Sequence, residues 1–224
     1  MAWPTTPAEL IVEQAEIARR SPPAWRVEGA PASVAGCFVC FARDAMGRGR
    51  PGEAAWAAAV LLRGDRLIAT HTLLGQGGAS YEPGLLALRE GPLLEAVVRA
   101  LPERPEVLLV NATGRDHPRR AGLALHLGAA LDLPTVGVTH RPLVAEGGWP
   151  EEERGSVAPL LLDGDLVGYW LRTQPGRRPL AVHAAWRTDA ETAVAVVLTT
   201  AVNTRTPAPL RWARQAARVL RARR

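Results

Sequence analysis

Apolar residues recur along the chain in short blocks separated by polar turns, and their spacing predicts a mixed order of strands and helices. Three strand-like blocks come early, and Gly64-Asp65 between the second and third is typical of a tight hairpin. Thr6 as N-cap, Pro7 and Glu9 then predict the start of a first helix. The predicted strands are 33–41, 55–63, 66–74, 107–110, 134–139, a hairpin within 157–173 and 178–183; the predicted helices are 6–20, 93–101, one opening near Pro118, 189–200 and 207–224.

The order of these elements indicates the fold class. Three antiparallel strands followed by alternating helices and strands predict an α/β protein in which a ribonuclease H-like mixed sheet is flanked by helices. The alternation in the second half implies parallel pairing there. No internal repeat or long linker is visible, so we expect residues 1–224 to form one domain.

The charge balance leaves contact with nucleic acid open. All 27 basic residues are arginine, against 22 acidic residues, which gives a formal net charge of +5. Arginine suits phosphate and base recognition, although a GC-rich genome also favours it over lysine. No run of 18 apolar residues predicts a membrane span, and the acids within the amphipathic first 20 residues argue against a signal peptide. We therefore expect a cytoplasmic protein without membrane contact.

Cys37 and Cys40 are the only cysteines, and they have C-x-x-C spacing. They lie inside a predicted strand, where residues three apart point to opposite faces of the sheet. That geometry does not favour a shared metal or a disulfide. The pattern predicts small buried side chains instead.

The stretch "VLLVNATGRDHPRR" is a buried strand that ends in a polar loop. Asn111 and Thr113 follow the strand directly, which predicts a site at the carboxyl edge of the sheet. Whether that site is catalytic depends on what surrounds it.

Five blocks of the sequence resemble the endonuclease V family, whose members are metal-dependent nucleases that cut next to deoxyinosine in DNA or inosine in RNA. The resemblance covers nearly the whole chain in the family's order, and it implies the ribonuclease H-like fold. The blocks are "SVAGCFVCF", "YEPGLLALREGPLLEAV", "LLVNATGRDHPRRAGLALHLGAALDLPTVGVTHRPL", "GYWLRTQPGRRPLAVHAAWRTDAETAVAVVL" and "PAPLRWARQAARVL".

The resemblance also implies a metal site, and this chain departs from it. The family holds a divalent cation with two Asp, one Glu and one His. The Glu is kept as Glu90, whereas Phe38, Asn111 and Trp186 occupy the other three positions, and the family's Lys falls on His140. Because Mg²⁺ prefers hard, mostly anionic oxygens, we expect no ordinary metal-dependent nuclease activity and no cofactor. Mg²⁺ is expected only if a residual nuclease site remains.

The part of the resemblance that concerns base recognition is better kept. The resemblance implies a wedge, a segment whose side chains fill the gap that an extruded base leaves in the duplex. Glu82 brings a negative charge to this wedge, and Ala112 replaces a pocket glycine of the family. The positions that match the wedge, the pocket walls and a phosphate-reaching helix start are Tyr81, Pro83, Gly84, Leu86, Gly114, His117, Arg119 and Arg120.

The replaced residues also suggest a different chemistry. Asn111, Thr113, His140 and His183 lie at predicted strand ends and are expected to converge with Glu90. Glu90 with a His would suit general acid–base catalysis without a metal. Cys40 with either His would suit a thiolate nucleophile.

Three hypotheses follow. The main one is a catalytically degenerate endonuclease V-like protein whose cleft binds nucleic acid or a protein partner. The second is a cleft repurposed as a metal-independent enzyme, or an enzyme subunit, acting on a small molecule. The third is an active Mg²⁺-dependent endonuclease that cuts near deoxyinosine with Glu90 and Asn111.

Overall fold

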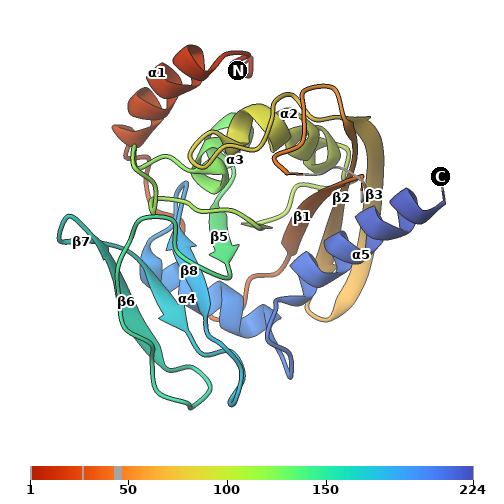
Figure 1. The fold of residues 1–224 in the computed structure, drawn as a ribbon. Coiled ribbons are helices and arrows are strands. Elements are labelled where there is room, and N and C mark those ends of the chain that lie inside the picture. Colours follow the sequence, from red (N-terminus) through yellow and green to blue (C-terminus); the bar gives the residue numbers. More distant parts are fainter. Residues whose placement is uncertain (1, 27, 43–46, 224) are drawn as a thin grey trace.

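The computed structural model describes residues 2–26, 28–42 and 47–223, and its centre is one eight-stranded sheet with the order β3-β2-β1-β4-β5-β8-β7-β6 (Figure 1). The predicted α/β class and ribonuclease H-like mixed sheet are confirmed. The strands are β1 Val34–Phe41, β2 Ala54–Arg63, β3 Arg66–Gln76, β4 Val107–Val110, β5 Thr135–Thr139, β6 Val157–Leu162, β7 Asp165–Leu171 and β8 Leu180–Ala184; the helices are α1 Pro7–Ala18, α2 Leu86–Arg99, α3 Leu123–Leu131, α4 Ala190–Thr200 and α5 Ala208–Ala222.

Strand β1 lies at the centre of the first half of the sheet. It pairs antiparallel with β2 and parallel with β4, with Cys37 opposite Val110. Strand β2 is buried from residue 55 to 62 because helices α2 and α5 both pack against it. The carboxyl ends of β1, β4 and β5 therefore lie side by side, which is where α/β sheets place ligand sites.

The second half of the sheet is antiparallel beyond β5. Strand β8 pairs antiparallel with β5, and the β6–β7 hairpin extends the sheet from β8. The predicted parallel pairing is therefore limited to the β1–β4 and β4–β5 pairs. The two-residue turn at Asp163-Gly164 makes β6 and β7 antiparallel, and β8 pairs antiparallel with both β7 and β5, so no further parallel pair forms among the described strands.

Two apolar layers cover the two faces of the sheet. Helices α1, α2 and α3 pack with Ala35, Cys37 and Val39 on one face. Helices α4 and α5 pack with Val34 and Val107 on the other face. No helix in the described part of the chain is long and apolar enough to cross a membrane.

Helix starts follow local chemistry, and two of them differ from the prediction. Thr6 caps α1, and the capping box with Glu9 is complete, as predicted. Helix α2 begins at Leu86 and contains Pro92, whereas the sequence pattern placed its start after that proline. Pro92 has no amide to donate to the carbonyl of Leu88; Gly78 packs against that carbonyl, where a Cβ atom would lie 2.2 Å from its oxygen, and the amide of Gly78 donates to the next carbonyl, that of Arg89, at 3.2 Å.

Helix α3 begins at Leu123 and not near Pro118. Arg120 has a φ of 55°, which no residue inside a right-handed helix adopts. The amide of Gly122 donates to the carbonyl of Gly114 at 2.8 Å, so residues 114–122 form a closed loop at the end of β4. This loop shapes one wall of the site.

Candidate functional site

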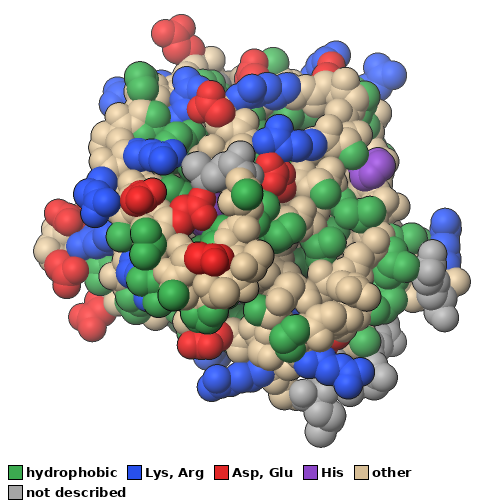
Figure 2. All heavy atoms as spheres, turned by 90° about the horizontal axis from the view of Figure 1, so that it is seen from above, with side chains coloured by type: hydrophobic (Ala, Val, Ile, Leu, Met, Phe, Trp, Pro, Cys, Tyr) green, Lys and Arg blue, Asp and Glu red, His purple; other side chains and the backbone are tan. Residues whose placement is uncertain are grey.

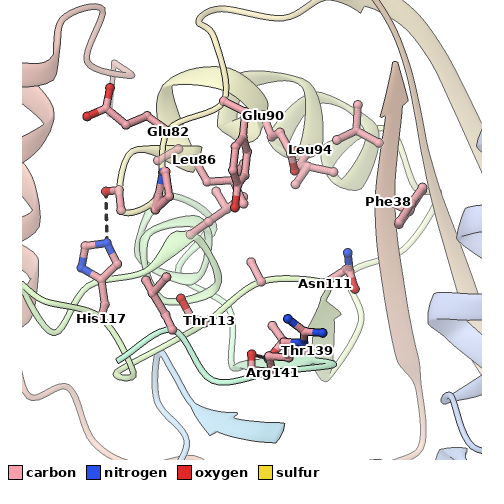
Figure 3. Close-up of a pocket in the computed structure, with 18 of the residues that line it drawn as sticks. Phe38, Glu82, Leu86, Glu90, Leu94, Asn111, Thr113, His117, Thr139 and Arg141 are labelled. Atoms are coloured by element: carbon pink, nitrogen blue, oxygen red, sulfur yellow. Dashed lines mark hydrogen bonds between the residues drawn. The ribbon is translucent and has the colours of Figure 1, made fainter. Parts of the chain in front are cut away.

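A cavity of about 410 Å³ opens between helix α2, the loop at residues 81–84 and the carboxyl ends of β1, β4 and β5 (Figure 3). Its size is within the range of small-ligand pockets. In Figure 3 the α2 side chains lie on one side, and the side chains from the ends of β4 and β5 lie on the other. The labelled lining residues are Phe38, Glu82, Leu86, Glu90, Leu94, Asn111, Thr113, His117, Thr139 and Arg141.

Glu90 is the acidic group on the α2 side of this cavity. Burial raises the pKa of its carboxyl to about 8, and the positive charge of Arg89 acts in the opposite direction. Burial, and then the nearby Glu90, also raise the pKa of the Cys37 thiol. At neutral pH Glu90 is therefore mostly protonated, and it can donate a proton.

The neighbouring Arg89 fixes the first turn of α2. Its guanidinium pairs with the carboxylate of Glu53, and both side chains are only 6% exposed. The same guanidinium donates to the carbonyl of Ala79 and lies 3.7 Å from the ring centroid of Phe41. This buried ion pair ties α2 to the start of β2, and so it sets the position of Glu90.

The rim of the cavity is a loop whose backbone is held from three directions. The carbonyl of Gly84 accepts from Gln14 at 3.1 Å and from Arg119 at 2.8 Å, and the Nε2 atom of His117 lies 3.1 Å from it. Gly84 has a φ of +82°, which side chains rarely allow. Burial lowers the pKa of His117 to about 4. Next to this anchored glycine, Tyr81 stays 47% exposed.

The two arginines predicted to reach phosphate, Arg119 and Arg120, are bonded to other groups of the protein. Arg119 donates from Nε to Gln14 at 2.6 Å, in addition to its bond with Gly84. Arg120 pairs with Asp163 and Asp165 at 3.0 and 3.3 Å. Neither arginine lines the cavity. Arg119 instead positions the rim, and Arg120 ties the loop after β4 to the β6–β7 turn.

Gly114 also lies outside the cavity lining, although it was predicted to form a pocket wall. A Cβ atom at this position would lie 2.1 Å from the carbonyl oxygen of Ala184. The glycine is therefore required by close packing of the loop after β4 against the end of β8.

The predicted convergence of Asn111, Thr113, His140 and His183 on Glu90 holds for the first two only. Asn111 and Thr113 line the cavity, whereas the two histidines do not. His183 is fully buried, with its Nε2 atom 2.8 Å from the hydroxyl of Thr139, and burial lowers its pKa to about 4.

Cys40 lies on the α5 side of the sheet, away from the cavity. Partial burial raises the pKa of its thiol, and the charges of Arg221 and Arg218 act in the opposite direction. Cys37, by contrast, is buried on the α2 side of the sheet. Cys37 is buried as predicted, whereas Cys40 is only half-buried. The cavity therefore does not contain the predicted thiolate–histidine pair.

Asp116 is a buried residue whose role the sequence pattern did not reveal. Its carboxylate accepts hydrogen bonds from the amides of Leu143, Val144 and Ala145 at 2.6, 2.9 and 2.7 Å. Its Oδ2 atom lies 3.6 Å from Nδ1 of His183. Asp116 thereby fixes the loop after β5, which brings Arg141 to the cavity.

The donor atoms at this site do not fit the usual Mg²⁺ shell. The cavity is lined by the carboxyl of Glu90, by the exposed carboxylate of Glu82 at its rim, by the amide of Asn111 and by the aromatic ring of Phe38. Trp186 is buried, and its indole nitrogen lies 3.5 Å from the carboxylate of Asp132. Among the residues that the structure describes, no group of three or more His, Cys, Asp or Glu side chains is arranged to hold a metal ion. Mg²⁺ prefers a shell of hard oxygens that usually includes carboxylates.

Comparison with known proteins identifies the family. The family profile "Endonuclease V" matches residues 24–215. An Endonuclease V of Thermus thermophilus is 39% identical over 223 residues, covering 98% of this chain and 96% of the relative. The crystal structure of an Endonuclease V from Streptomyces avermitilis superposes with a TM-score of 0.87 at 35% identity, covering 99% of this chain and 96% of that one. A Ciona intestinalis Endonuclease V in complex with DNA containing an inosine shares the fold, with a TM-score of 0.79 at 20% identity, covering 96% and 98% of the two chains.

These similarities contradict the main sequence-based hypothesis. The sequence predicted a catalytically degenerate protein because three of the family's four metal-site positions are replaced. The similarity to proteins named Endonuclease V nevertheless extends over 98% of the chain. The family profile alone spans more than half of the sequence. The chain therefore belongs to the endonuclease V family.

Proposed function

We propose that this protein is an endonuclease that binds inosine-containing DNA in the cavity and cuts the strand beside the modified base. The cutting activity is supported by the near full-length similarity to proteins named Endonuclease V. The substrate class is supported by the Ciona protein, which is bound to DNA containing an inosine. The observation that carries the proposal is the cavity at the carboxyl edge of the sheet, where Glu90 lies across from Asn111 and Arg141 (Figure 3).

Binding of the base uses the rim and the cavity together. A base that leaves the duplex exposes a gap, and apolar side chains that enter the gap offset part of the lost stacking. Tyr81 and Pro83 are exposed at the rim and suited to that role. Because the adjacent Gly84 carbonyl is held by Gln14 and Arg119, the rim is already ordered before DNA binds.

Cleavage of the strand requires a positive group beside the phosphate and a proton for the departing oxygen. Arg141 lies on the β5 side of the cavity and supplies the positive charge. Glu90, with its pKa near 8, supplies the proton. Water attacks phosphorus as the bond to the departing sugar oxygen breaks, the proton of Glu90 passes to that oxygen, and the proton that the attacking water loses returns to the Glu90 carboxylate.

The direct test is cleavage of a labelled duplex that carries one inosine, compared with the same duplex carrying guanine. Reactions are run with Mg²⁺, with Mn²⁺ and with a chelator. We expect a single cut near the inosine and no cut in the guanine duplex. Intact inosine duplex under all three conditions, at protein concentrations that saturate binding, would disprove the proposal.

Replacing Tyr81 by Ala is expected to reduce cleavage of the inosine duplex about tenfold, because a wedge in the duplex offsets an unstacking cost of about a few kcal/mol per base step. Tyr81→Phe keeps the ring and should retain activity. On a single-stranded oligonucleotide there is no gap to fill, so Tyr81→Ala should have little effect. Equal losses on both substrates would show that Tyr81 does not act as a wedge.

A further inference from the structure

Arginines from three separate segments converge on His140 at the end of β5. Partial burial lowers the pKa of His140, and the charges of Arg205, Arg214 and Arg178 lower it further. Arg178 lies in the β7–β8 connection, Arg205 precedes α5, and Arg214 belongs to α5. Arg205 donates to the carbonyls of Arg178 and Pro179 at 2.7 and 3.2 Å, which holds two of these segments together.

Helix α5 extends this convergence along one side of the molecule. Arg211, Arg214 and Arg218 follow one another at spacings of three and four residues, so they share a face of the helix. They line a shallow groove on α5 together with Gln215, Val219 and Ala222. The helix is seated on the sheet by its small and apolar residues, which leaves this arginine face outward.

The arginines near His140 and on α5 differ from the arginines that form ion pairs. Elsewhere, Arg63 pairs with Glu103, and Arg99 pairs with Glu95. Within the described ranges, no acidic side chain pairs with the arginines of α5 or with Arg178 and Arg205. On the face shown in Figure 2, basic and acidic side chains are interspersed. None of the acidic side chains that the structure describes therefore competes with an external anion for the charges around His140, although Arg205 also donates to two carbonyls and the guanidinium of Arg178 lies 5.3 Å from the ring centroid of Trp149.

One of these arginines, Arg214, borders the cavity. The guanidinium of Arg214 lies 5.0 Å from the ring centroid of Phe38, which lines the cavity. Arg141, the neighbour of His140 in sequence, also lines it. A strand whose base occupies the cavity would thus leave it beside Arg214.

We propose that Arg178, Arg205, Arg214 and Arg218 form a phosphate-binding surface, here called the arginine surface, that holds the nucleic-acid backbone next to the cavity. This inference rests on the proposed function, because it specifies where the same substrate is held. The chemistry that supports it is a set of guanidinium groups that lack acidic partners and follow one path, which matches the regular charges of a phosphate backbone. Arg205 also positions the surface through its two carbonyl contacts.

The test is the salt dependence of binding to an ordinary duplex without inosine. Each phosphate contact contributes about 0.9 to the slope of log affinity against log salt. The double variant Arg214→Gln/Arg218→Gln is therefore expected to have a slope about 2 units less steep than the unmodified protein. Fluorescence anisotropy over a series of KCl concentrations measures this slope. An unchanged slope would overturn the proposal.

Two matched variants separate a surface from a general effect of charge. Arg63→Gln/Arg99→Gln removes the same net charge from acid-paired positions and should leave the slope unchanged. Arg214→Lys/Arg218→Lys keeps the charge and should retain the slope if the helix stays folded. If the Arg63→Gln/Arg99→Gln variant lost as much slope as the Arg214→Gln/Arg218→Gln variant, binding would depend on net charge alone and the arginine surface would be disproved. The duplex in this binding assay has no inosine. The salt dependence therefore tests the arginine surface even if the protein fails to cut the inosine duplex.

Discussion

Glu90→Gln is expected to abolish cleavage and at the same time to stabilise the folded protein at alkaline pH. The amide keeps the shape of the side chain but cannot deliver a proton to the departing oxygen, and loss of a general acid reduces rate by about 100- to 10,000-fold. Single-turnover cleavage of the inosine duplex measures this loss. Activity of the unmodified protein should decline as the pH rises through about 8, because Glu90 then loses its proton.

The effect on stability follows from the same pKa. Burial raises the pKa of Glu90 from 4.5 to about 8, so the folded protein keeps a proton that the unfolded chain has already released. The stability that this proton contributes is present below pH 4.5 and is lost as the pH rises to about 8. Above pH 8 the buried charge costs about 2 kcal/mol relative to Gln, after allowance for water in the cavity. Urea unfolding at pH 5 and pH 9 measures the difference; parallel pH dependence in both proteins would contradict it.

Arg89→Met is expected to destabilise the protein by about 3–5 kcal/mol, because it leaves the carboxylate of Glu53 buried without a partner. The double variant Arg89→Met/Glu53→Met removes both charges and should recover most of that loss. Arg99→Gln, which breaks the more exposed pair with Glu95, should cost less than about 1 kcal/mol. Chemical unfolding of the four proteins completes the comparison.

The Arg89 variant also affects the site. Since the charge of Arg89 lowers the pKa of Glu90, its removal should shift the alkaline limit of cleavage to higher pH. If Arg89→Met were as stable as the unmodified protein, the pair would have no structural role. If the double variant were as unstable as the single one, the loss would come from packing against Phe41 and not from the unpaired charge.

Most strands could be predicted because their signals are local. The apolar blocks and the turn at Gly64-Asp65 place β1, β2 and β3 to within two residues of their observed ends. The start of α2 could not be predicted in this way, because Pro92 ends a helix by local rules. The segment that packs against this turn of the helix contains Gly78, which reaches the helix only in the folded protein.

The site residues that could be predicted are also those whose signals are local. Asn111 and Thr113 follow a buried strand directly, so their place at the sheet edge is a local property. The pairing of Cys40 with a histidine could not be judged from sequence, because which face of β1 borders the cavity depends on where α5 packs. Asp116 resembles any loop acid in sequence, and its role appears only when three distant amides surround it.

The position of β1 in the sheet has a consequence for the order of folding. The hairpins β2–β3 and β6–β7 join neighbouring segments, whereas β1 must find β4 across more than 60 residues of chain. Contacts between distant segments close more slowly than local ones. Because the cavity lies where β1, β4 and β5 end together, we expect it to be among the last parts of the protein to form. Amide protons in β4 should accordingly gain protection later than those in β2 and β3 during refolding.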